Sequence, residues 1–346
     1  VTVTAKNFVI ATGSRAFDIP GFAPDGKNVI TSTEALDFTS VPKRLVVIGG
    51  GYIGLELGTY LAKVGSQITV LEGTSKLLAA MDQDCVAVVA RGLKKRNVNV
   101  ILEAKAKAYK KTPKGLEITF DTPKGTQSTE CDVILVTVGR KPNSDTLDLA
   151  KAGLQPNQKG YIDIDKKCRT KVPHIYAIGD VAGGLLLAHK ASREGIVAAE
   201  VIAGQKSAFD TTIIPAVVFT DPEIATVGLT LAEAQAAGFD AHEAQFPFAA
   251  LGKALATGES DGFVKVIADR KTHRFLGFHI VGAEASAILG EAGLALEAGI
   301  VLEDMALTIH AHPTLPEAMM EAAEVALGHP IHIVTRPARP GAEKTA

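Results

Sequence analysis

Short apolar runs alternate with helical stretches through the first half of the chain. Residues 44–48 are apolar except for the first, as expected of a strand that is covered on both faces. Residues 52–64 then predict a helix that Gly65 ends. This repetition of strand and helix predicts a parallel sheet with helices on both faces. The same part of the chain predicts strands over 67–71, 99–102 and 133–138, a helix over 82–96 and an exposed hairpin over 105–130.

The pattern changes after about residue 210. Residues 140–210 still predict one buried strand, over 175–178, and one helix, over 190–203. Beyond them, several strands follow one another without a long helix after each, which is typical of an α+β domain with a largely antiparallel sheet. The strands are expected over 216–220, 225–229, 263–268 and 275–281, and two helices over 286–299 and 316–328.

Composition narrows the class of protein. The 346 residues carry a formal net charge of −2, which argues against a nucleic-acid coat protein or an acidic tail. No uncharged apolar run approaches the length of a membrane span, and no secretory signal opens the chain. The three cysteines, Cys85, Cys131 and Cys168, have spacings that match neither a metal site nor a redox pair, and such low cysteine usage is typical of a reducing compartment.

The first candidate site is the glycine motif at residues 49–54, which contains G-x-G-x-x-G between a predicted strand and a predicted helix. Gly49 would allow a sharp turn, Gly51 the close approach of a pyrophosphate, and Gly54 close packing of helix on strand. The helix N-terminus favours an anion. Glu72, which ends the next strand, would bind a ribose hydroxyl and repel a 2′-phosphate, so NAD is favoured over NADP. A purely structural tight turn is the alternative.

Two further motifs are candidates. Gly179-Asp180 follows a buried strand and could bind a polyol, although such a pair is more often a simple turn. In the segment 310–317, His312 could act as a general base and Glu317 could orient its imidazole. The alternative is structural, because Thr314 and Glu317 have the spacing of a capping box and histidines near turns are commonly just solvated.

Together these motifs resemble the FAD-dependent pyridine nucleotide–disulphide oxidoreductases. Seven motifs occur in family order along nearly the whole chain, so the joint signal is strong although several parts are weak. The seven are Ala11-Thr12-Gly13-Ser14-Arg15, the glycine motif continuing into Gly54-Leu55-Glu56, Val138-Gly139-Arg140-Lys141-Pro142-Asn143, Tyr176-Ala177-Ile178-Gly179-Asp180, Leu187-Ala188-His189-Lys190-Ala191, Phe219-Thr220-Asp221-Pro222-Glu223 and the His-Ala-His-Pro-Thr segment at 310–314.

The resemblance implies cofactors and site residues. Asp180 would hold the flavin ribitol, residues 187–189 (Leu187, Ala188 and His189) would run along the pyrimidine side of the flavin, and Thr12, Gly13 and Arg15 would line its site. Glu56 would lie near nicotinamide and flavin, and Gly139 would approach NAD. His312, with Glu317 as its partner, would act on substrate at the other subunit of a homodimer.

The resemblance also implies an architecture of two Rossmann-like nucleotide-binding domains, the FAD one incomplete, and an α+β dimerisation domain. The expected bounds are 1–40 with 140–210 for the partial FAD-binding domain, 41–139 for the NAD-binding domain, 211–333 for the interface domain and 334–346 for a tail. The family's N-terminal FAD-binding motif and redox disulfide are expected upstream, in a segment on the order of a hundred residues. Segments 6–13 and 174–180 are expected to share one sheet whose other strands lie there.

Within the family, the His-x-His-Pro-Thr pattern and Glu72 favour lipoamide over glutathione as substrate. The implied activity of the full-length protein is oxidation of protein-bound dihydrolipoamide and reduction of NAD, through FAD and a redox disulfide that lies outside this chain, in the 2-oxo-acid dehydrogenase complexes. The chain alone is expected to be inactive. The cytoplasm is the expected compartment, or the mitochondrial matrix in a eukaryote, and no metal is expected. Two alternatives remain: a non-catalytic NAD-binding and dimerising fragment, and a related flavoprotein with another disulfide substrate.

Overall fold

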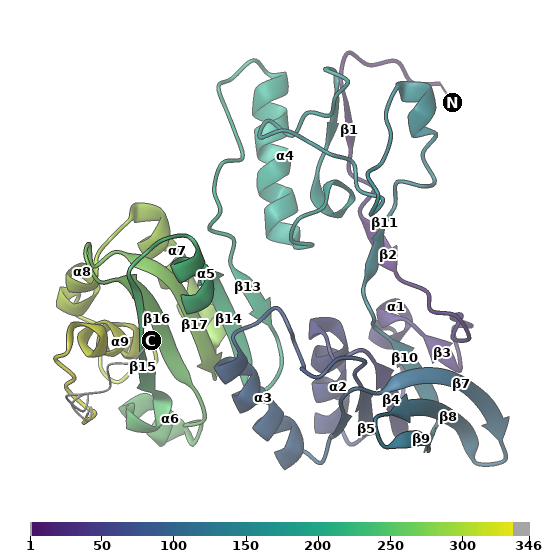
Figure 1. The fold of residues 1–346 in the computed structure, drawn as a ribbon, viewed down its shortest axis with the longest axis horizontal. Coiled ribbons are helices and arrows are strands. Elements are labelled where there is room, and N and C mark those ends of the chain that lie inside the picture. Colours follow the sequence, from purple (N-terminus) through teal and green to yellow (C-terminus); the bar gives the residue numbers. More distant parts are fainter. Residues whose placement is uncertain (1, 335–346) are drawn as a thin grey trace, which may run out of the picture. The chain divides into compact units, whose positions relative to one another are not determined.

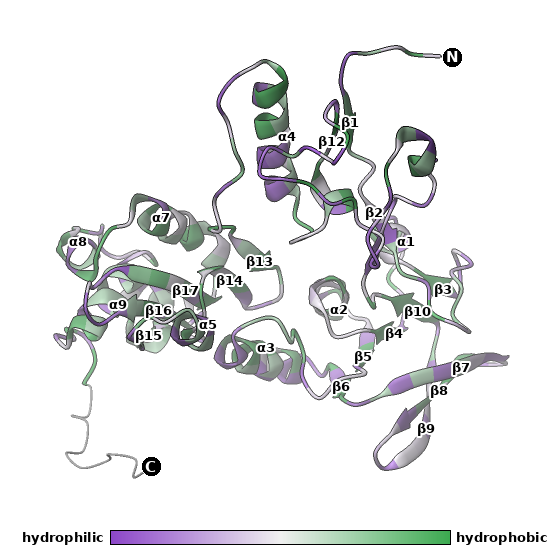
Figure 2. Cartoon of the chain, turned by 45° about the horizontal axis from the view of Figure 1, so that its top comes forward, coloured by the Kyte–Doolittle hydropathy of each residue, from purple (hydrophilic) through white to green (hydrophobic). Residues whose placement is uncertain are grey.

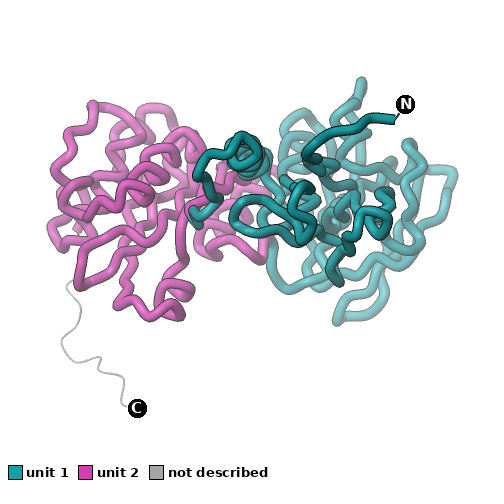
Figure 3. The backbone as a smooth tube through the Cα atoms, turned by 90° about the horizontal axis from the view of Figure 1, so that it is seen from above, with its two compact units in different colours: residues 1–77, 97–212 teal, residues 78–96, 213–346 magenta. Residues whose placement is uncertain are grey.

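A computed structural model describes residues 2–334 and divides the chain into two compact units (Figure 3). Unit 1 comprises residues 1–77 and 97–212, and unit 2 comprises residues 78–96 and 213–346. The tail expected at 334–346 lies outside the described residues, apart from Val334.

A five-stranded parallel sheet forms the centre of unit 1, which confirms the predicted parallel sheet (Figure 1). The chain steps from the central strand β4 through β5 to β6 on one side, and places β10 and then β3 on the other. The direction in which successive strands are added therefore reverses between β4 and β10. In parallel sheets of this kind, ligands bind at such a position, at the carboxyl ends of the strands. The strands are β3 (Val29–Ile30), β4 (Arg44–Ile48), β5 (Gln67–Leu71), β6 (Asn99–Ile101) and β10 (Val133–Val136).

The two faces of this sheet are covered differently, so the prediction of helices on both faces is wrong. Helix α2 (Tyr52–Lys63) covers one face, where an added Cβ at Gly58 would meet Val47 and Ile68. A three-stranded antiparallel sheet packs on the other, and it replaces the hairpin expected over 105–130. Its middle strand alternates buried apolar residues, Leu116, Ile118 and Phe120, with more exposed ones, which gives it one apolar face. The three strands are β7 (Lys105–Thr112), β8 (Gly115–Thr122) and β9 (Gly125–Cys131).

The remaining elements of unit 1 are two small strand pairs, the helices α1 and α4, and the 3₁₀ turns η1 and η2. Strand β1 pairs with β12 in parallel, which confirms that segments 6–13 and 174–180 share a sheet, and Phe8 and Val9 of β1 are exposed. Strand β2 pairs with β11 in antiparallel orientation, and a 3₁₀ turn, η2, leads from β12 towards α4. These elements are β1 (Phe8–Ile10), β2 (Ser14–Ala16), α1 (Ser32–Leu36), β11 (Arg140–Pro142), η1 (Leu149–Ala152), β12 (Ile175–Ala177), η2 (Gly179–Ala182) and α4 (Ala188–Ile202).

Unit 2 is built on a five-stranded antiparallel sheet in the order β13-β14-β17-β16-β15, as the sequence predicts for this region. The sequence did not predict β15 or the short helices α5, α6 and α8. The elements are α3 (Gln83–Lys95), β13 (Ala216–Val218), β14 (Glu223–Gly228), α5 (Leu231–Ala236), β15 (Ala241–Pro247), η3 (Phe248–Ala250), α6 (Gly252–Thr257), β16 (Phe263–Asp269), β17 (Phe275–Gly282), α7 (Ala285–Ala298), α8 (Leu302–Leu307) and α9 (Glu317–Leu327).

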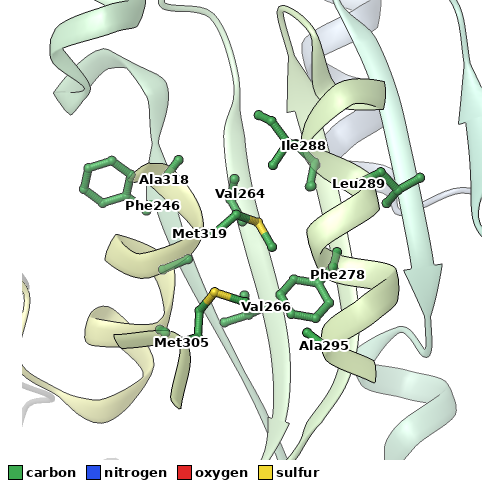
Figure 4. Packing of buried hydrophobic residues seen from close by; sticks show 14 of the residues in the cluster. Phe246, Val264, Val266, Phe278, Ile288, Leu289, Ala295, Met305, Ala318 and Met319 are labelled. Atoms are coloured by element: carbon green, nitrogen blue, oxygen red, sulfur yellow. The ribbon is translucent and has the colours of Figure 1, made fainter. Parts of the chain in front are cut away.

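The core of unit 2 lies between one face of this sheet and helices α7, α8 and α9. Apolar colour concentrates on β16 and β17 (Figure 2), and Met305 and Met319 of the helices meet Val264, Val266 and Phe278 of the strands (Figure 4). Burial of these side chains is the main source of the unit's stability. It also fixes α9, on which Glu317 is the first residue.

Helix α3 packs on the opposite face of the same sheet. The buried ammonium of Lys265 lies 2.9 Å from Asp82 Oδ2 and 2.5 Å from Asp84 Oδ2, at the start of the helix. The helix thus belongs to unit 2 by its contacts, whereas the expected domain bounds group it with 41–139.

Candidate functional sites

The glycine motif forms the turn between β4 and α2 at the carboxyl edge of the parallel sheet. Gly49 has a φ of +109°, which favours glycine, and an added Cβ would lie 2.7 Å from the carbonyl oxygen of Thr137. At Gly54 an added Cβ would lie 2.4 Å from the Gly49 oxygen and 2.5 Å from Thr137 Oγ1. These two glycines therefore let the turn, the helix and β10 pack closely.

Gly51 has a different environment. It is the N-cap of α2, no side chain caps the helix, and an added Cβ would meet no atom within 4 Å. The N-terminus of this 12-residue helix thus presents backbone N–H groups to open space, as an anion site requires. Gly139, which follows β10 with a φ of +131°, is open in the same sense, and Glu56 lies one turn into α2.

Glu72 shapes the loop beside this turn. Its carboxylate accepts N–H groups from Gly50 (2.6 Å) and Thr74 (2.7 Å), one on each oxygen. Each oxygen retains a lone pair, so a ribose hydroxyl can still donate to the carboxylate. A recess of about 490 Å³ adjoins it, and its lining residues are Gly73, Thr74, Ser75, Glu103, Lys105, Asp121, Thr122 and Pro123.

The different environments of Gly54 and Gly51 lead to a prediction. We expect Gly54→Ala to lower the free energy of unfolding by about 1–3 kcal/mol, because its methyl group overlaps a backbone oxygen. We expect Gly51→Ser to leave stability unchanged or raised, since serine is a good N-cap, yet to raise KM for NAD, since its side chain occupies the open space. Urea unfolding and NAD titration measure the two effects. A Gly51→Ser variant with unaltered KM would contradict the anion site.

Asp180 lies in η2, directly after β12. It accepts a short hydrogen bond from the Ser14 hydroxyl, and Arg140 Nε is 3.8 Å from its carboxylate. Arg140 in turn donates to Ser14 Oγ at 2.6 Å. Gly179, with a φ of +71°, lets the chain turn so that Asp180 follows the strand. The structure thus brings Asp180 together with the strand pair β2–β11, although these segments are far apart in the sequence.

Thr12, Gly13 and Arg15 lie on the same side of unit 1 and contact the segment after β11. Thr12 Oγ1 donates to the carbonyl of Asn143, and Gly13 accepts from its N–H. Arg15 makes two hydrogen bonds to Asp145, of 3.0 and 2.6 Å, and holds the pKa of that carboxyl well below its usual range. Through this carboxylate partner, Arg15 joins strand β2 to the segment after β11.

The N-terminus of α4 is a second candidate binding position, in addition to Asp180. Leu187 is its N-cap, without a side-chain cap, and Ala188 and His189 are the first two helical residues. The first backbone N–H groups of a helix point out of its start, where they can donate to a carbonyl oxygen of a ligand. Asp180 and this helix start fit the polyol and the carbonyl edge of a flavin, respectively.

His312 and Glu317 form a hydrogen-bonded pair in unit 2. The distance from His312 Nδ1 to Glu317 Oε1 is 2.8 Å, and the imidazole is 75% exposed whereas the carboxylate is 14% exposed. Burial of the Glu317 carboxyl opposes ionisation, but hydrogen bonds from the Thr314 N–H and from His312 outweigh it and lower its pKa. Glu317 is therefore an anion at neutral pH, beside an accessible imidazole.

The capping-box alternative is realised only in part. Glu317 Oε2 accepts the Thr314 N–H at 2.6 Å, as in a capping box. The Thr314 hydroxyl, however, donates to the carbonyl of Ala311, and the N-cap of α9 is Pro316, without a side-chain cap. Glu317 thus uses one oxygen for the turn and the other for His312.

Sequence reasoning missed several side-chain pairs near these sites. In unit 2, His310 Nε2 lies 2.8 Å from Glu291, and His332 pairs with the buried Glu321, one turn after Glu317. In unit 1, Lys190 pairs with Glu194 inside the fold. The i,i+4 spacing of Lys190 and Glu194 was a usable signal. The histidine pairs join different segments and carried no local signal.

The three cysteines are buried free thiols. Burial raises the pKa of Cys131 to about 12 and that of Cys168 to about 11, and it also raises the pKa of Cys85. They are therefore poor nucleophiles and do not form a redox disulfide with one another. Within residues 2–334, no helix is long and apolar enough to cross a bilayer, and no three His, Cys, Asp or Glu side chains gather as metal ligands do.

Two family descriptions match the sequence: "Pyridine nucleotide-disulphide oxidoreductase" over residues 1–195 and the dimerisation domain of that family over residues 214–323. The chain is 49% identical over 335 residues to the dihydrolipoyl dehydrogenase of Geobacillus stearothermophilus, which covers 97% of this chain and 71% of that protein. It is 47% identical to the dihydrolipoyl dehydrogenase of Haloferax volcanii, with the same coverage of each chain.

Solved structures agree. The crystal structure of LpdA from Mycobacterium tuberculosis has a TM-score of 0.85 at 29% identity, and the similarity covers 92% of this chain and 69% of LpdA. The HOCl-induced flavoprotein disulfide reductase RclA from Escherichia coli has a TM-score of 0.84 at 26% identity, covering 92% of this chain and 73% of RclA. The chain thus belongs to the pyridine nucleotide-disulphide oxidoreductase family, with the dihydrolipoyl dehydrogenases.

Proposed function

We propose that this protein oxidises protein-bound dihydrolipoamide and reduces NAD. One observation carries the proposal: an exposed imidazole, His312, is held 2.8 Å from an ionised carboxylate, Glu317, which suits deprotonation of a thiol substrate. The identity of 49% to a dihydrolipoyl dehydrogenase favours this substrate over that of RclA, to which the identity is 26%.

NAD would bind at the carboxyl edge of the parallel sheet. The N-terminus of α2 would take the pyrophosphate, with Gly51 allowing its approach, and Glu72 would accept a hydrogen bond from the adenosine ribose. The polar recess beside Glu72 offers room for the adenosine end. Gly139 would approach NAD, and Glu56 would lie near the nicotinamide and the flavin, as the family resemblance implies.

FAD and NAD are the cofactors of this family. The residues around Asp180 and the start of α4 fit FAD. Asp180 would accept hydrogen bonds from the ribitol chain, and the backbone N–H groups at 187–189 would donate to the pyrimidine carbonyl edge. Thr12, Gly13 and Arg15 would close this side, held by Asn143 and Asp145. When bound, FAD supplies the two-electron chemistry between the dithiol and NAD.

His312 would take the thiol proton. A hydrogen bond from Nδ1–H to Glu317 leaves the lone pair on Nε2, which can accept the proton of a dithiol. An ordinary thiol has a pKa near about 8.5 and reacts as the thiolate, so a base at this position raises the reactive fraction at neutral pH. Glu317 would stabilise the imidazolium that forms.

The dimerisation domain at 214–323 makes the protein a homodimer. In addition, we propose that lipoyl domains of the 2-oxo-acid dehydrogenase complexes are its partners and that His312 acts on substrate at the other subunit. The cytoplasm, or the mitochondrial matrix in a eukaryote, suits three unpaired thiols.

A comparison of substrates tests the function. The FAD-loaded dimer of the full-length protein is expected to reduce NAD with dihydrolipoamide and to leave glutathione disulfide unreduced with either NADH or NADPH. Efficient reduction of glutathione disulfide would contradict the proposed substrate and would indicate a related flavoprotein that acts on another disulfide. Absence of activity with both substrates, in a preparation that retains FAD, would favour a binding role without catalysis.

Replacement of Glu72 tests the choice of nicotinamide. The Glu72 carboxylate would lie beside the 2′-phosphate of NADP. Repulsion between two like charges about 4 Å apart near a protein surface is worth on the order of 1–4 kcal/mol. We expect Glu72→Ala to lower the ratio of kcat/KM for NAD to that for NADP by roughly tenfold or more. Glu72→Gln keeps the size of the side chain and one of the two oxygens that accept the N–H groups of Gly50 and Thr74, so it separates loss of the charge from loss of the side chain. Equal use of NAD and NADP by the unaltered protein would show that Glu72 has another role.

A further inference from the structure

A buried ion pair lies on the first turns of α4. Lys190 Nζ is 2.9 Å from Glu194 Oε1, and the two side chains are only 6% and 3% exposed. Removing two charges from water is costly, and the cost is offset only where further hydrogen bonds satisfy both groups. The pair therefore needs an explanation beyond the stability of the helix.

Both charged groups bind the turn that carries Asp180. Lys190 Nζ donates to the carbonyl of Gly183 at 2.5 Å, and Glu194 Oε2 accepts the N–H of Gly179 at 2.7 Å. Gly179 and Gly183 flank the turn, with Asp180 directly after the first of them. The Lys190–Glu194 clamp, as we call this pair, thus holds the turn at both ends.

The turn depends on such support because its backbone is unusual. Gly179, Gly183 and Gly184 have φ values of +71°, +84° and +73°, and glycine loses more conformational freedom on ordering than any other residue. The turn also lies directly on the helix, since an added Cβ at Gly179 would be 3.1 Å from the Cβ of Ala191. The clamp side chains come from the same helical segment.

We propose that Lys190 and Glu194 are positioning residues for FAD. The proposed flavin site has two parts, the Asp180 carboxylate and the N–H groups at 187–189, which are separated by a glycine-containing loop. The clamp is anchored within the first turns of α4 and fixes the Asp180 turn relative to the start of that helix. The proposal rests on the assignment of these two parts to FAD.

Flavin affinity in three variants of the dimer tests the clamp. Lys190→Met removes the ammonium and leaves the Glu194 charge buried without its cation; Glu194→Gln keeps the shape but removes the charge; the double variant removes both charges. We expect the dissociation constant for FAD to rise roughly 10- to 100-fold in Lys190→Met and in the double variant, the size expected from loss of a hydrogen bond to a charged group.

The double variant distinguishes positioning from bulk stability. Removing both charges relieves the unpaired buried charge, so thermal stability should recover towards that of the unaltered protein while FAD affinity stays weakened. The affinity for NAD, which binds elsewhere in unit 1, should change less than about twofold, within the range of remote substitutions. Lys151→Met, which breaks the exposed pair of Lys151 with Asp148, is the matched control and should change neither property.

The outcomes separate the two proposals. If FAD affinity in the double variant returns to the original value together with stability, the pair is only structural and the positioning proposal is wrong. If the unaltered protein binds no FAD, the proposed function itself fails. A perturbed visible spectrum of flavin bound to the double variant, with unchanged NAD affinity, would support the clamp.

Discussion

Replacing His312 with Gln is expected to slow oxidation of dihydrolipoamide by roughly 10²–10⁴-fold, the usual contribution of a general base. The imidazole donates through Nδ1 to Glu317 and is 75% exposed, so glutamine removes the base with little change in buried surface. Oxidation of NADH by an artificial acceptor, which bypasses the dithiol step, should be nearly unchanged. Steady-state rates with both electron acceptors, together with the melting temperature, measure the effect.

Glu317→Gln provides the matched comparison. It should cause a smaller loss with the same selectivity, because glutamine still accepts a hydrogen bond from His312 but no longer stabilises its positive charge. This variant also alters the contact with the Thr314 N–H, so a fall in melting temperature alone reports on the turn. Equal losses in the dithiol and NADH assays would show that these residues support the fold, as the capping-box alternative requires.

Two local arrangements that the sequence predicted, the glycine turn and the contact of His312 with Glu317, are both formed by residues close in sequence. The glycine turn follows from residues 44–54, where an apolar strand, a glycine motif and a helix start are contiguous. The contact of His312 with Glu317 spans five residues across one turn. In both places the local chain geometry alone brings the groups together, and residue types with short spacing are sufficient evidence.

Contacts between distant segments had no such signal. Asp145 lies 130 residues from Arg15, and Asp82 lies 183 residues from Lys265, which is the contact that places α3 in unit 2. Only tertiary packing brings these residues together. A single charged residue on a helix or strand does not indicate which distant residue will be its partner. The sequence therefore predicted Arg15 as lining a flavin site without revealing that a carboxylate already holds its guanidinium.

The errors in the fold have a related cause. Strand β8 alternates Leu116, Ile118 and Phe120 with polar residues inside a region rich in Lys and Thr, so composition masked a sheet with one buried face. Strand β15 was missed because its middle residues, His242, Glu243 and Gln245, are polar. Both strands have only one apolar face, and the average hydropathy of a segment does not detect alternation.

Disrupting the dimer is the second large effect that we expect. Leu307 and Ile309, which are 81% and 96% exposed, lie close in sequence to His312 within the segment matched by the dimerisation domain. An obligate dimer interface buries well over about 1,000 Å² and tolerates unpaired charges poorly. The double substitution Leu307→Glu with Ile309→Glu should therefore convert the dimer into a monomer.

Such a monomer should lose oxidation of dihydrolipoamide, because His312 is proposed to act at the flavin of the partner subunit. Oxidation of NADH by an artificial acceptor should persist, since the residues proposed to bind NAD and those proposed to bind flavin all belong to unit 1. Leu36→Glu, an equally exposed apolar position in unit 1, is the control and should remain dimeric and active. Sedimentation velocity and the two assays give the result. A monomer with full dithiol activity would mean that His312 serves its own subunit, and a double variant that stays dimeric would mean that the interface lies on another surface of unit 2.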